Sequence, residues 1–154
     1  ISLYILEGNE RVCVDLVGRR NTKRIVARVG RRIPLYAGSA GKVFLAFLPP
    51  ARRDELLESI ELKPMTRLTI ADKNELKENL EKIYRQGYAV SKGEWILDAA
   101  GVAAPIFDQI GRVTAALAIS GPAQRFIDNK IKEMAALVKE GAAEISAELG
   151  FLPR

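Results

Sequence analysis

The chain has 154 residues, of which 48% are hydrophobic and 28% are charged, as in ordinary globular domains. One domain of this size buries about 68–70% of its unfolded surface, so we expect it to fold without disulfides or a structural metal. The composition excludes a disordered or collagen-like chain. The sequence contains no run of about 18 apolar residues, so it predicts no membrane-spanning helix. The single cysteine, Cys13, cannot form an internal disulfide, which favours a cytoplasmic protein.

The sequence contains no histidine. The usual base of Ser-His-Asp and Cys-His catalysis and the commonest ligand of zinc and iron are therefore missing. Acid–base chemistry would have to rest on carboxylates such as Glu94 or Asp98, on a lysine or on a tyrosine. We therefore predict that the protein is not an enzyme and carries no metal or other cofactor.

The net charge of +5 is concentrated in one part of the chain. Residues 16–53 contain ten basic residues and no acid, whereas residues 1–15 and 54–154 carry net charges of −2 and −3. The basic stretch 19–32 could contact nucleic-acid phosphates, or it could be a solvated loop and strand edge. Because no aromatic residues interleave this stretch to stack on bases, we favour the second interpretation.

The first residues predict a β-hairpin. Apolar residues alternate with others over 3–5 and again over 12–16, and Gly8-Asn9 is a typical two-residue turn. Cys13 lies inside the second strand, where we expect a small buried hydrophobic residue rather than a reactive thiol. Another strand is expected from Ile25 to Val29.

A glycine-rich turn at residues 38–42 leads into the apolar run 43–48, which predicts a short buried helix. The free N–H groups and positive dipole end at a helix start suit a carboxylate or another small anion. Gly38 and Gly41 would allow a ligand to approach the backbone closely. The alternative is a simple helix start with Ser39 as the N-cap. The spacing alone leaves both interpretations open.

Two more helices are expected in the middle of the chain. The first runs from Pro50 to Ser59. The second begins after Asp72 as N-cap, has a capping box with Glu75 and ends near Gly87. Its apolar stripe consists of Leu76, Leu80 and Ile83. A strand is expected to begin at Tyr88-Ala89-Val90, followed by an irregular segment, Lys92 to Asp98, that contains the only tryptophan, Trp95.

The segment from Gly101 to Gly121 predicts a long hairpin: a strand over 102–107, a turn at 108–111 and a return strand over 112–120. Pro105 requires an edge position or a bulge. One face of the return strand carries Val113, Ala115, Leu117 and Ile119, and the other carries the small residues Thr114, Ala116, Ala118 and Ser120. A tightly packed helix could cover the small face, or the face could leave room for a ligand.

The last part of the chain predicts one long helix. Its apolar stripe consists of Ile127, Ile131, Met134, Val138, Ile145 and Leu149. We interpret this stripe as covering a sheet first and as a dimer seam second. Strands alternating with helices, and hairpins at each end, predict an α/β sandwich around one mostly antiparallel sheet.

Three ordered motifs resemble the effector-binding domain of IclR-type transcriptional regulators. These are the segment 28–42, the sequence Gly87-Tyr88-Ala89, and a hairpin made of 103–108, Gly111 and 118–122. The resemblance covers nearly the whole chain. It implies a GAF-like α/β fold, one mostly antiparallel curved sheet flanked by helices, with residues 1–154 forming a single domain.

The resemblance also implies a function. Such domains bind a small metabolite, often an organic acid, and thereby modulate DNA binding and transcription by the intact protein. They follow an amino-terminal winged helix-turn-helix that binds operator DNA. We expect that element to be absent from this chain, which lacks an initiator Met and is expected to be a fragment of something longer. Members usually form homodimers or homotetramers. Alternatives are a nucleic-acid contact through 19–32 and a purely structural oligomerisation module.

The family's effector pocket falls on several residues of this chain. We hypothesise that a small carboxylate docks against the backbone amides of residues 39–41 and that two serine hydroxyls, those of Ser91 and Ser120, orient it. Trp95 is either a pocket wall or a core or interface residue. Because residues 95–97 are unusually apolar for the family, the expected ligand is bulkier or more apolar than a two- or three-carbon acid. The expected effector-binding residues are Gly38, Ser39, Ala40, Gly41, Ser91, Gly101, Ala118 and Ser120.

Overall fold

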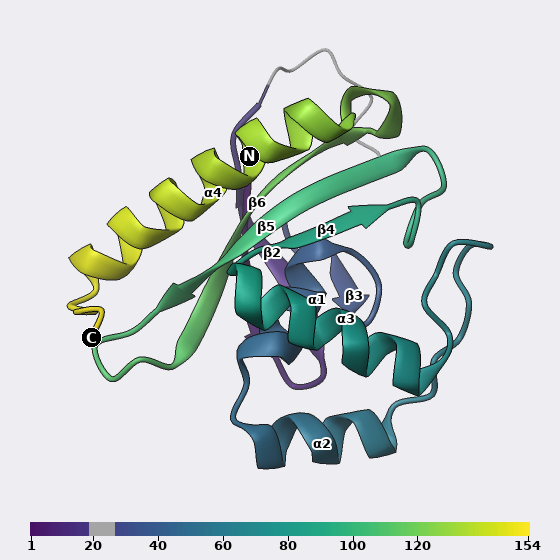
Figure 1. The fold of residues 1–154 in the computed structure, drawn as a ribbon, viewed down its shortest axis with the longest axis horizontal. Helices are drawn as coiled ribbons and strands as arrows, with labels where there is room; N and C mark the ends of the chain where they lie inside the picture. The colour runs from purple at the N-terminus through teal and green to yellow at the C-terminus, as the bar shows by residue number, and fades with distance from the viewer. Residues whose placement is uncertain (19–26) are drawn as a thin grey trace.

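The computed structural model describes residues 1–18 and 27–154. These residues form a curved six-stranded antiparallel sheet with helices on both of its faces (Figure 1). The α/β fold expected from the sequence is confirmed. The elements in chain order are β1 (Ser2–Glu7), β2 (Glu10–Leu16), β3 (Arg32–Pro34), α1 (Ser39–Phe47), α2 (Pro50–Ser59), α3 (Lys73–Gln86), β4 (Ala89–Lys92), β5 (Ala99–Phe107), β6 (Val113–Pro122), the 3₁₀ turn η1 (Ala123–Arg125) and α4 (Asp128–Glu148).

The sheet joins two hairpins that are far apart in the sequence. The strand order is β3-β2-β1-β6-β5-β4, and every neighbouring pair is antiparallel. The hairpins β1–β2 and β5–β6 confirm both hairpin predictions. They meet where β1 pairs with β6, with Ser2 opposite Ala118. Pro105 pairs with Ala116 of β6 on one side. On its other side no strand among the described residues is paired, because Ala103 is the last β5 residue that pairs with β4. The predicted edge position of Pro105 is therefore confirmed.

The third strand was placed wrongly from the sequence. Of the expected strand from Ile25 to Val29, residues 25–26 lie outside the described residues, and residues 27–29 form no strand. The chain first turns at Gly30, which has a φ of 84°, and the N–H of Arg31 donates to the carbonyl of Arg28. It becomes extended only after this turn, as β3.

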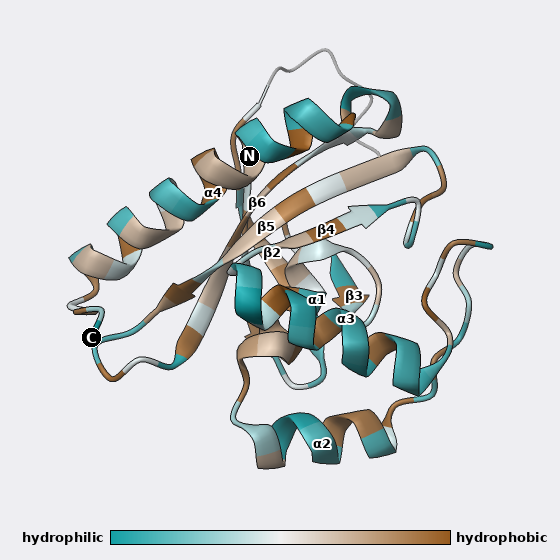
Figure 2. Ribbon diagram, in the orientation of Figure 1, coloured by the Kyte–Doolittle hydropathy of each residue, from teal (hydrophilic) through white to brown (hydrophobic). Residues whose placement is uncertain are grey.

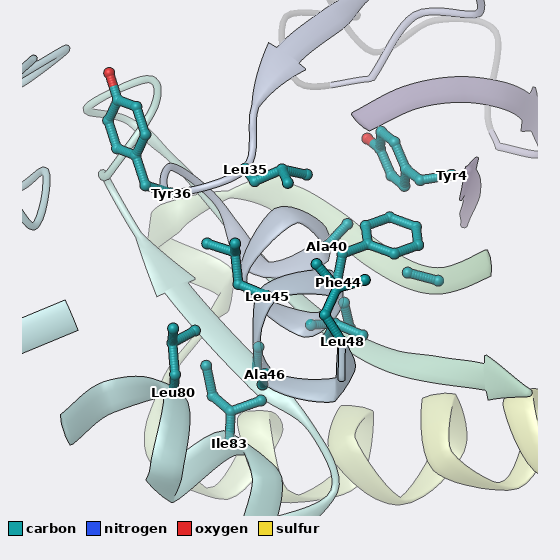
Figure 3. Packing of buried hydrophobic residues seen from close by; sticks show 14 of the residues in the cluster. Tyr4, Leu35, Tyr36, Ala40, Phe44, Leu45, Ala46, Leu48, Leu80 and Ile83 are labelled. Atoms are coloured by element: carbon teal, nitrogen blue, oxygen red, sulfur yellow. The ribbon is translucent and has the colours of Figure 1, made fainter. Parts of the chain in front are cut away.

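Helix α1 lies between the sheet and α3, so every residue from Ser39 to Ala46 is buried. Figure 3 shows Leu45 and Ala46 of α1 on the side of Leu80 and Ile83 of α3, whereas the ring of Phe44 points toward Tyr4. The predicted start and end of α3 are confirmed. The Asp72 side chain accepts a hydrogen bond from the N–H of Glu75, and Gly87 ends the helix with a φ of 82°. Helix α2 has the predicted bounds.

Helix α4 covers the opposite face of the sheet (Figure 1). The predicted stripe is only partly correct, because Ile127, Ile145 and Leu149 are 55%, 36% and 48% exposed. Three predicted residues, Ile131, Met134 and Val138, do pack against the core on this face. The other buried residues of the helix are small: Ala135, Ala142 and Ser146. Figure 2 shows that the strands are largely apolar, whereas α2 and α3 carry many hydrophilic residues.

The two faces of β6 are separated as predicted except at Val113. Ala115, Leu117 and Ile119 pack on the α4 side, and the small residues Ala116 and Ala118 pack on the α1 side. Val113 packs on the α1 side instead of beside Ala115, because the β5–β6 register shifts between Ile106 and Phe107. No helix among residues 1–18 and 27–154 is long and apolar enough to cross a membrane.

Candidate functional site

A pocket opens at the N-terminal end of α1, on the side of the sheet that α1 covers. It contains about 330 Å³ of unoccupied space, including its solvent-facing mouth. Residues from five strands, the start of α1 and the β4–β5 loop form its wall. The lining residues are Tyr4, Arg11, Gly38, Ser39, Ser91, Trp95, Ile96, Ala99, Ala100, Gly101 and Ser120.

Gly38 determines how α1 begins at this pocket. It is the N-cap, with a φ of 91°, and Ser39 is the first helical residue and makes no capping bond, so the alternative with Ser39 as N-cap is wrong. A side chain at position 38 would also collide with Arg11, since a Cβ would lie 2.5 Å from Nη2 of that residue. The first N–H groups of a helix have no intrahelical acceptor and lie at its positive end. These groups suit an anion.

Two serines and a glycine form a row across the floor of the pocket. Ser91 on β4 pairs with Gly101 on β5, which pairs with Ser120 on β6. A Cβ on Gly101 would lie 2.8 Å from the Ser39 hydroxyl and 3.3 Å from the Ser120 hydroxyl. The missing side chain at Gly101 therefore leaves the space into which hydroxyl groups from α1 and β6 converge.

Of the nine residues that the sequence predicted for the site, six line the pocket and three do not. Those on the pocket wall are Gly38, Ser39, Ser91, Trp95, Gly101 and Ser120. Ala40 and Ala118 are buried in the hydrophobic core and do not line the pocket. At Gly41 the close approach is to the protein itself, since a Cβ would lie 2.3 Å from the carbonyl oxygen of Leu35.

Sequence reasoning missed the side chain of Arg11, which lines the pocket from β2. Only 5% of Arg11 is exposed, and its Nε has no hydrogen-bond partner among the described residues. The guanidinium lies over the Tyr4 ring, 5.0 Å from the ring centroid. Burial lowers the pKa of this guanidinium from its usual value, because desolvation disfavours the charged form. The alternation of side chains along a strand could have predicted the burial of Arg11, because residue 11 lies on the same face of β2 as Cys13, which was expected to be buried.

Cys13 itself behaves as predicted. Its side chain is buried, and burial raises the pKa of the thiol, which disfavours the reactive thiolate.

A buried ion pair ties the β4–β5 loop to α1. Nζ of Lys42 lies 2.8 Å from Oε2 of Glu94 and also donates to the carbonyl of Val90. Thr69 donates to the carbonyl of Glu94. From the sequence, Glu94 was expected only as a candidate catalytic carboxylate. The structure shows it bound to Lys42, and Asp98, the other candidate, is exposed and outside the pocket.

The described end of the basic stretch contacts one residue of the pocket wall, Trp95. The Arg31 guanidinium lies 5.0 Å from the centroid of the Trp95 ring, and Arg32 forms an ion pair with Glu7. Trp95 is both a wall residue and packed against the core. Residues 19–26 of the basic stretch lie outside the described residues. Among those that the structure describes, no group of three His, Cys, Asp or Glu residues could hold a metal ion.

Comparison with known proteins identifies the family. A family profile described as "Bacterial transcriptional regulator IclR C-terminal" matches residues 1–147. The chain belongs to the IclR family. The resemblance found in the sequence motifs is therefore confirmed, and this chain is the carboxy-terminal, effector-binding domain of an IclR regulator.

Relatives of this IclR domain are regulators of transcription. The HTH-type transcriptional repressor AllR of Salmonella typhi is 36% identical, over 99% of this chain and 56% of its own length. A crystal structure of Thermotoga maritima IclR is 40% identical, with a TM-score of 0.93 over 97% of this chain and 61% of that one. An IclR homologue from Microbacterium hydrocarbonoxydans, complexed with 4-hydroxybenzoate, is 30% identical, with a TM-score of 0.83 over 96% of this chain and 59% of that one. This chain thus spans slightly over half the length of such relatives.

Proposed function

We propose that residues 1–154 form one ligand-sensing domain, which binds a small organic acid in the pocket at the start of α1. The observation that carries this proposal is the row Ser91–Gly101–Ser120, which faces the free N–H groups of α1 across an open space. Amide hydrogens at a helix start bind a carboxylate, and hydroxyl groups fix its orientation. The 4-hydroxybenzoate bound by the Microbacterium homologue supports a carboxylate ligand.

The remaining wall indicates what the rest of the ligand is like. Trp95 and Ile96 add apolar side chains to the pocket wall, which also contains the polar groups of the floor. An acid with an apolar or aromatic body places its carboxylate at α1 and its body against these two side chains.

The proposed output is a change in operator binding by the intact regulator. The ligand contacts α1 and the β4–β5 loop at the same time, and the Lys42–Glu94 pair joins these two walls. Binding shifts the loop from Ser91 to Gly101 and with it the packing between subunits of a homodimer or homotetramer. A typical coupling free energy of about 1–3 kcal/mol changes operator affinity by about 5–150-fold. The operator contacts belong to an amino-terminal winged helix-turn-helix of the intact protein.

A panel of acids tests the proposal. The melting temperature (Tm) of this chain is measured with mono- and dicarboxylic acids, including 4-hydroxybenzoate, and each hit is titrated by calorimetry. We expect at least one acid to raise the Tm and to bind with one site per chain. In the intact regulator the same acid should change operator affinity in a mobility-shift assay. Absence of binding by every acid of the panel would contradict the proposal.

A further inference from the structure

We propose that Arg11 is the charge-selecting residue of this pocket: its guanidinium binds the carboxylate of the effector, and the pocket therefore takes a ligand with one negative charge. This inference rests on the proposed function and names the chemical class of the ligand. It starts from a residue that neither the motifs nor the family resemblance singled out.

The first step is that Arg11 is buried and that, among the described residues, no carboxylate is bonded to it. It is 5% exposed, its Nε lacks a hydrogen-bond partner, and no carboxylate among the described residues forms an ion pair with it. Residues 19–26, which the structure does not describe, contain no acidic residue. Burying a charge without a partner is unfavourable. An anionic ligand would remove this cost.

The second step is that the guanidinium lies where a ligand carboxylate would be bound. Its Nη2 is the nearest atom to the position of a Cβ on Gly38, the N-cap of α1. Both residues line the pocket. The charge of Arg11 and the positive end of the helix therefore act on the same small volume. The Tyr4 ring holds one face of the guanidinium but accepts no in-plane hydrogen bond from it.

The third step is the balance of buried charge around the pocket. Three charged side chains are buried there: Arg11, Lys42 and Glu94. The charge of Glu94 acts on Arg11, but its Oε2 is already bound to Lys42. Two positive charges thus face one negative charge, so a single additional negative charge neutralises the cluster. A monocarboxylate supplies that charge, whereas a dicarboxylate would bring one too many.

Arginine suits this task better than lysine. Its planar fork can donate two parallel hydrogen bonds to one carboxylate, whereas the ammonium of lysine acts as a point charge. Arg11→Lys should therefore restore only part of the affinity that a neutral substitution removes.

The test compares matched ligands and matched variants. The ligands are acetate, 4-hydroxybenzoate and succinate, together with the neutral acetamide and 4-hydroxybenzamide, titrated into the whole chain. The variants are Arg11→Met and Arg11→Lys. Arg52→Met, which removes an exposed charge from α2, is the control. Arg11→Gln replaces Arg11→Met if the latter does not fold.

We expect wild type and Arg52→Met to bind a monocarboxylate and to bind its amide at least about tenfold more weakly. Arg11→Met should lose at least about tenfold in carboxylate affinity and no longer distinguish acid from amide. Without ligand, Arg11→Met should have a Tm equal to or above that of wild type, because an unpaired buried charge has been removed.

Equal affinity of wild type and Arg11→Met for a carboxylate would overturn this inference and leave the proposed function intact. Tighter binding of succinate than of every monocarboxylate would also overturn it. If no acid binds wild type, the proposed function fails, and the ligand-free Tm decides the role of Arg11. A Tm of Arg11→Met equal to or above that of wild type would support a site for a different anion, and a Tm below that of both wild type and Arg52→Met would overturn the inference.

Discussion

Lys42 and Glu94 form a buried ion pair, with Nζ 2.8 Å from Oε2, that joins two walls of the pocket. Lys42 lies one turn into α1, just after the residues that line the pocket, and Glu94 directly precedes Trp95 of the β4–β5 loop. Lys42 is 1% exposed. The pair therefore couples the position of the loop to the helix whose N-terminus faces the ligand.

Lys42→Met should lower the free energy of unfolding by about 3–5 kcal/mol, because the buried carboxylate of Glu94 would lose the ammonium group that is bonded to its Oε2. The double variant Lys42→Met/Glu94→Leu should recover much of this loss, since neither charge of the pair remains buried. Urea denaturation followed by circular dichroism measures both. The control is Lys63→Met, which breaks an exposed pair with Glu61 and should cost about 0–1 kcal/mol. A similar small cost for Lys42→Met would show that the pair is not structural.

Gly101→Ala should weaken acid binding without unfolding the chain. The new methyl group would lie 2.8 Å from the Ser39 hydroxyl and 3.3 Å from that of Ser120, in the space proposed for the ligand. A steric cost of about 1–3 kcal/mol corresponds to a loss of affinity of about 5–150-fold. Calorimetry with the best acid of the panel measures it.

Gly121→Ala provides the matched control for Gly101→Ala on the neighbouring strand. A Cβ at Gly121 would meet no atom closer than a Phe126 ring carbon at 3.6 Å, which is an ordinary contact. It should bind the acid as wild type does. Unchanged affinity of Gly101→Ala would contradict the proposed floor of the pocket.

Gly41→Ala should destabilise the domain by about 1–3 kcal/mol, although alanine is normally the better helix former. The reason is that the added Cβ would lie 2.3 Å from the backbone carbonyl oxygen of Leu35, which cannot move as a side chain can. In contrast, Gly141→Ala in α4 meets only the end of the Leu117 side chain at 3.0 Å and should be neutral or slightly stabilising. Thermal unfolding of the two variants distinguishes these outcomes. Equal effects would show that the α1 start tolerates a side chain.

The carboxylate of Asp108 should stabilise the β5–β6 turn in a pH-dependent way. The pKa of Asp108 is lowered mainly because the backbone N–H of Arg112 donates a hydrogen bond to its carboxylate. Hydrogen bonds from the Arg112 side chain and from the N–H of Ile110 contribute as well. Because the folded-state pKa lies below the unfolded one, this stabilisation is complete above the ordinary aspartate pKa of 3.8 and is lost as the pH falls through the folded-state value.

Asp108→Asn removes the titration of this side chain. The difference in unfolding free energy between wild type and Asp108→Asn should be constant above about pH 5 and should shrink at lower pH. Urea denaturation across a pH series measures it. A difference that stays constant down to pH values below 3.8 would show that the carboxylate charge contributes nothing to the turn.

Local signals in the sequence predicted most of the fold. The turn at Gly8-Asn9 defined the first hairpin, and the Asp72 cap and Gly87 defined α3. Two errors arose from features without such a signal. Strand β3 has only three residues, too few for an alternation pattern, and the bulge that displaces Val113 depends on pairing with β5.

The site was predicted only in part, for a related reason. Glycines and serines at a helix start and in one strand row suggested the floor of the pocket. Arg11 and Lys42, however, are charged residues, which are seldom fully buried, so their types pointed to the surface. Their burial depends on tertiary contacts with Tyr4 and Glu94, which are brought near them by the fold.

The position of the ligand is tested most directly by amide chemical shifts of the ¹⁵N-labelled chain during titration with the acid that raises its Tm most. We predict that the largest shifts occur together at Ser39, Gly101 and Ser120, with one saturation curve. Shifts confined to the outer face of α4 or to residues 19–32, with Ser39, Gly101 and Ser120 unchanged, would contradict the proposed pocket.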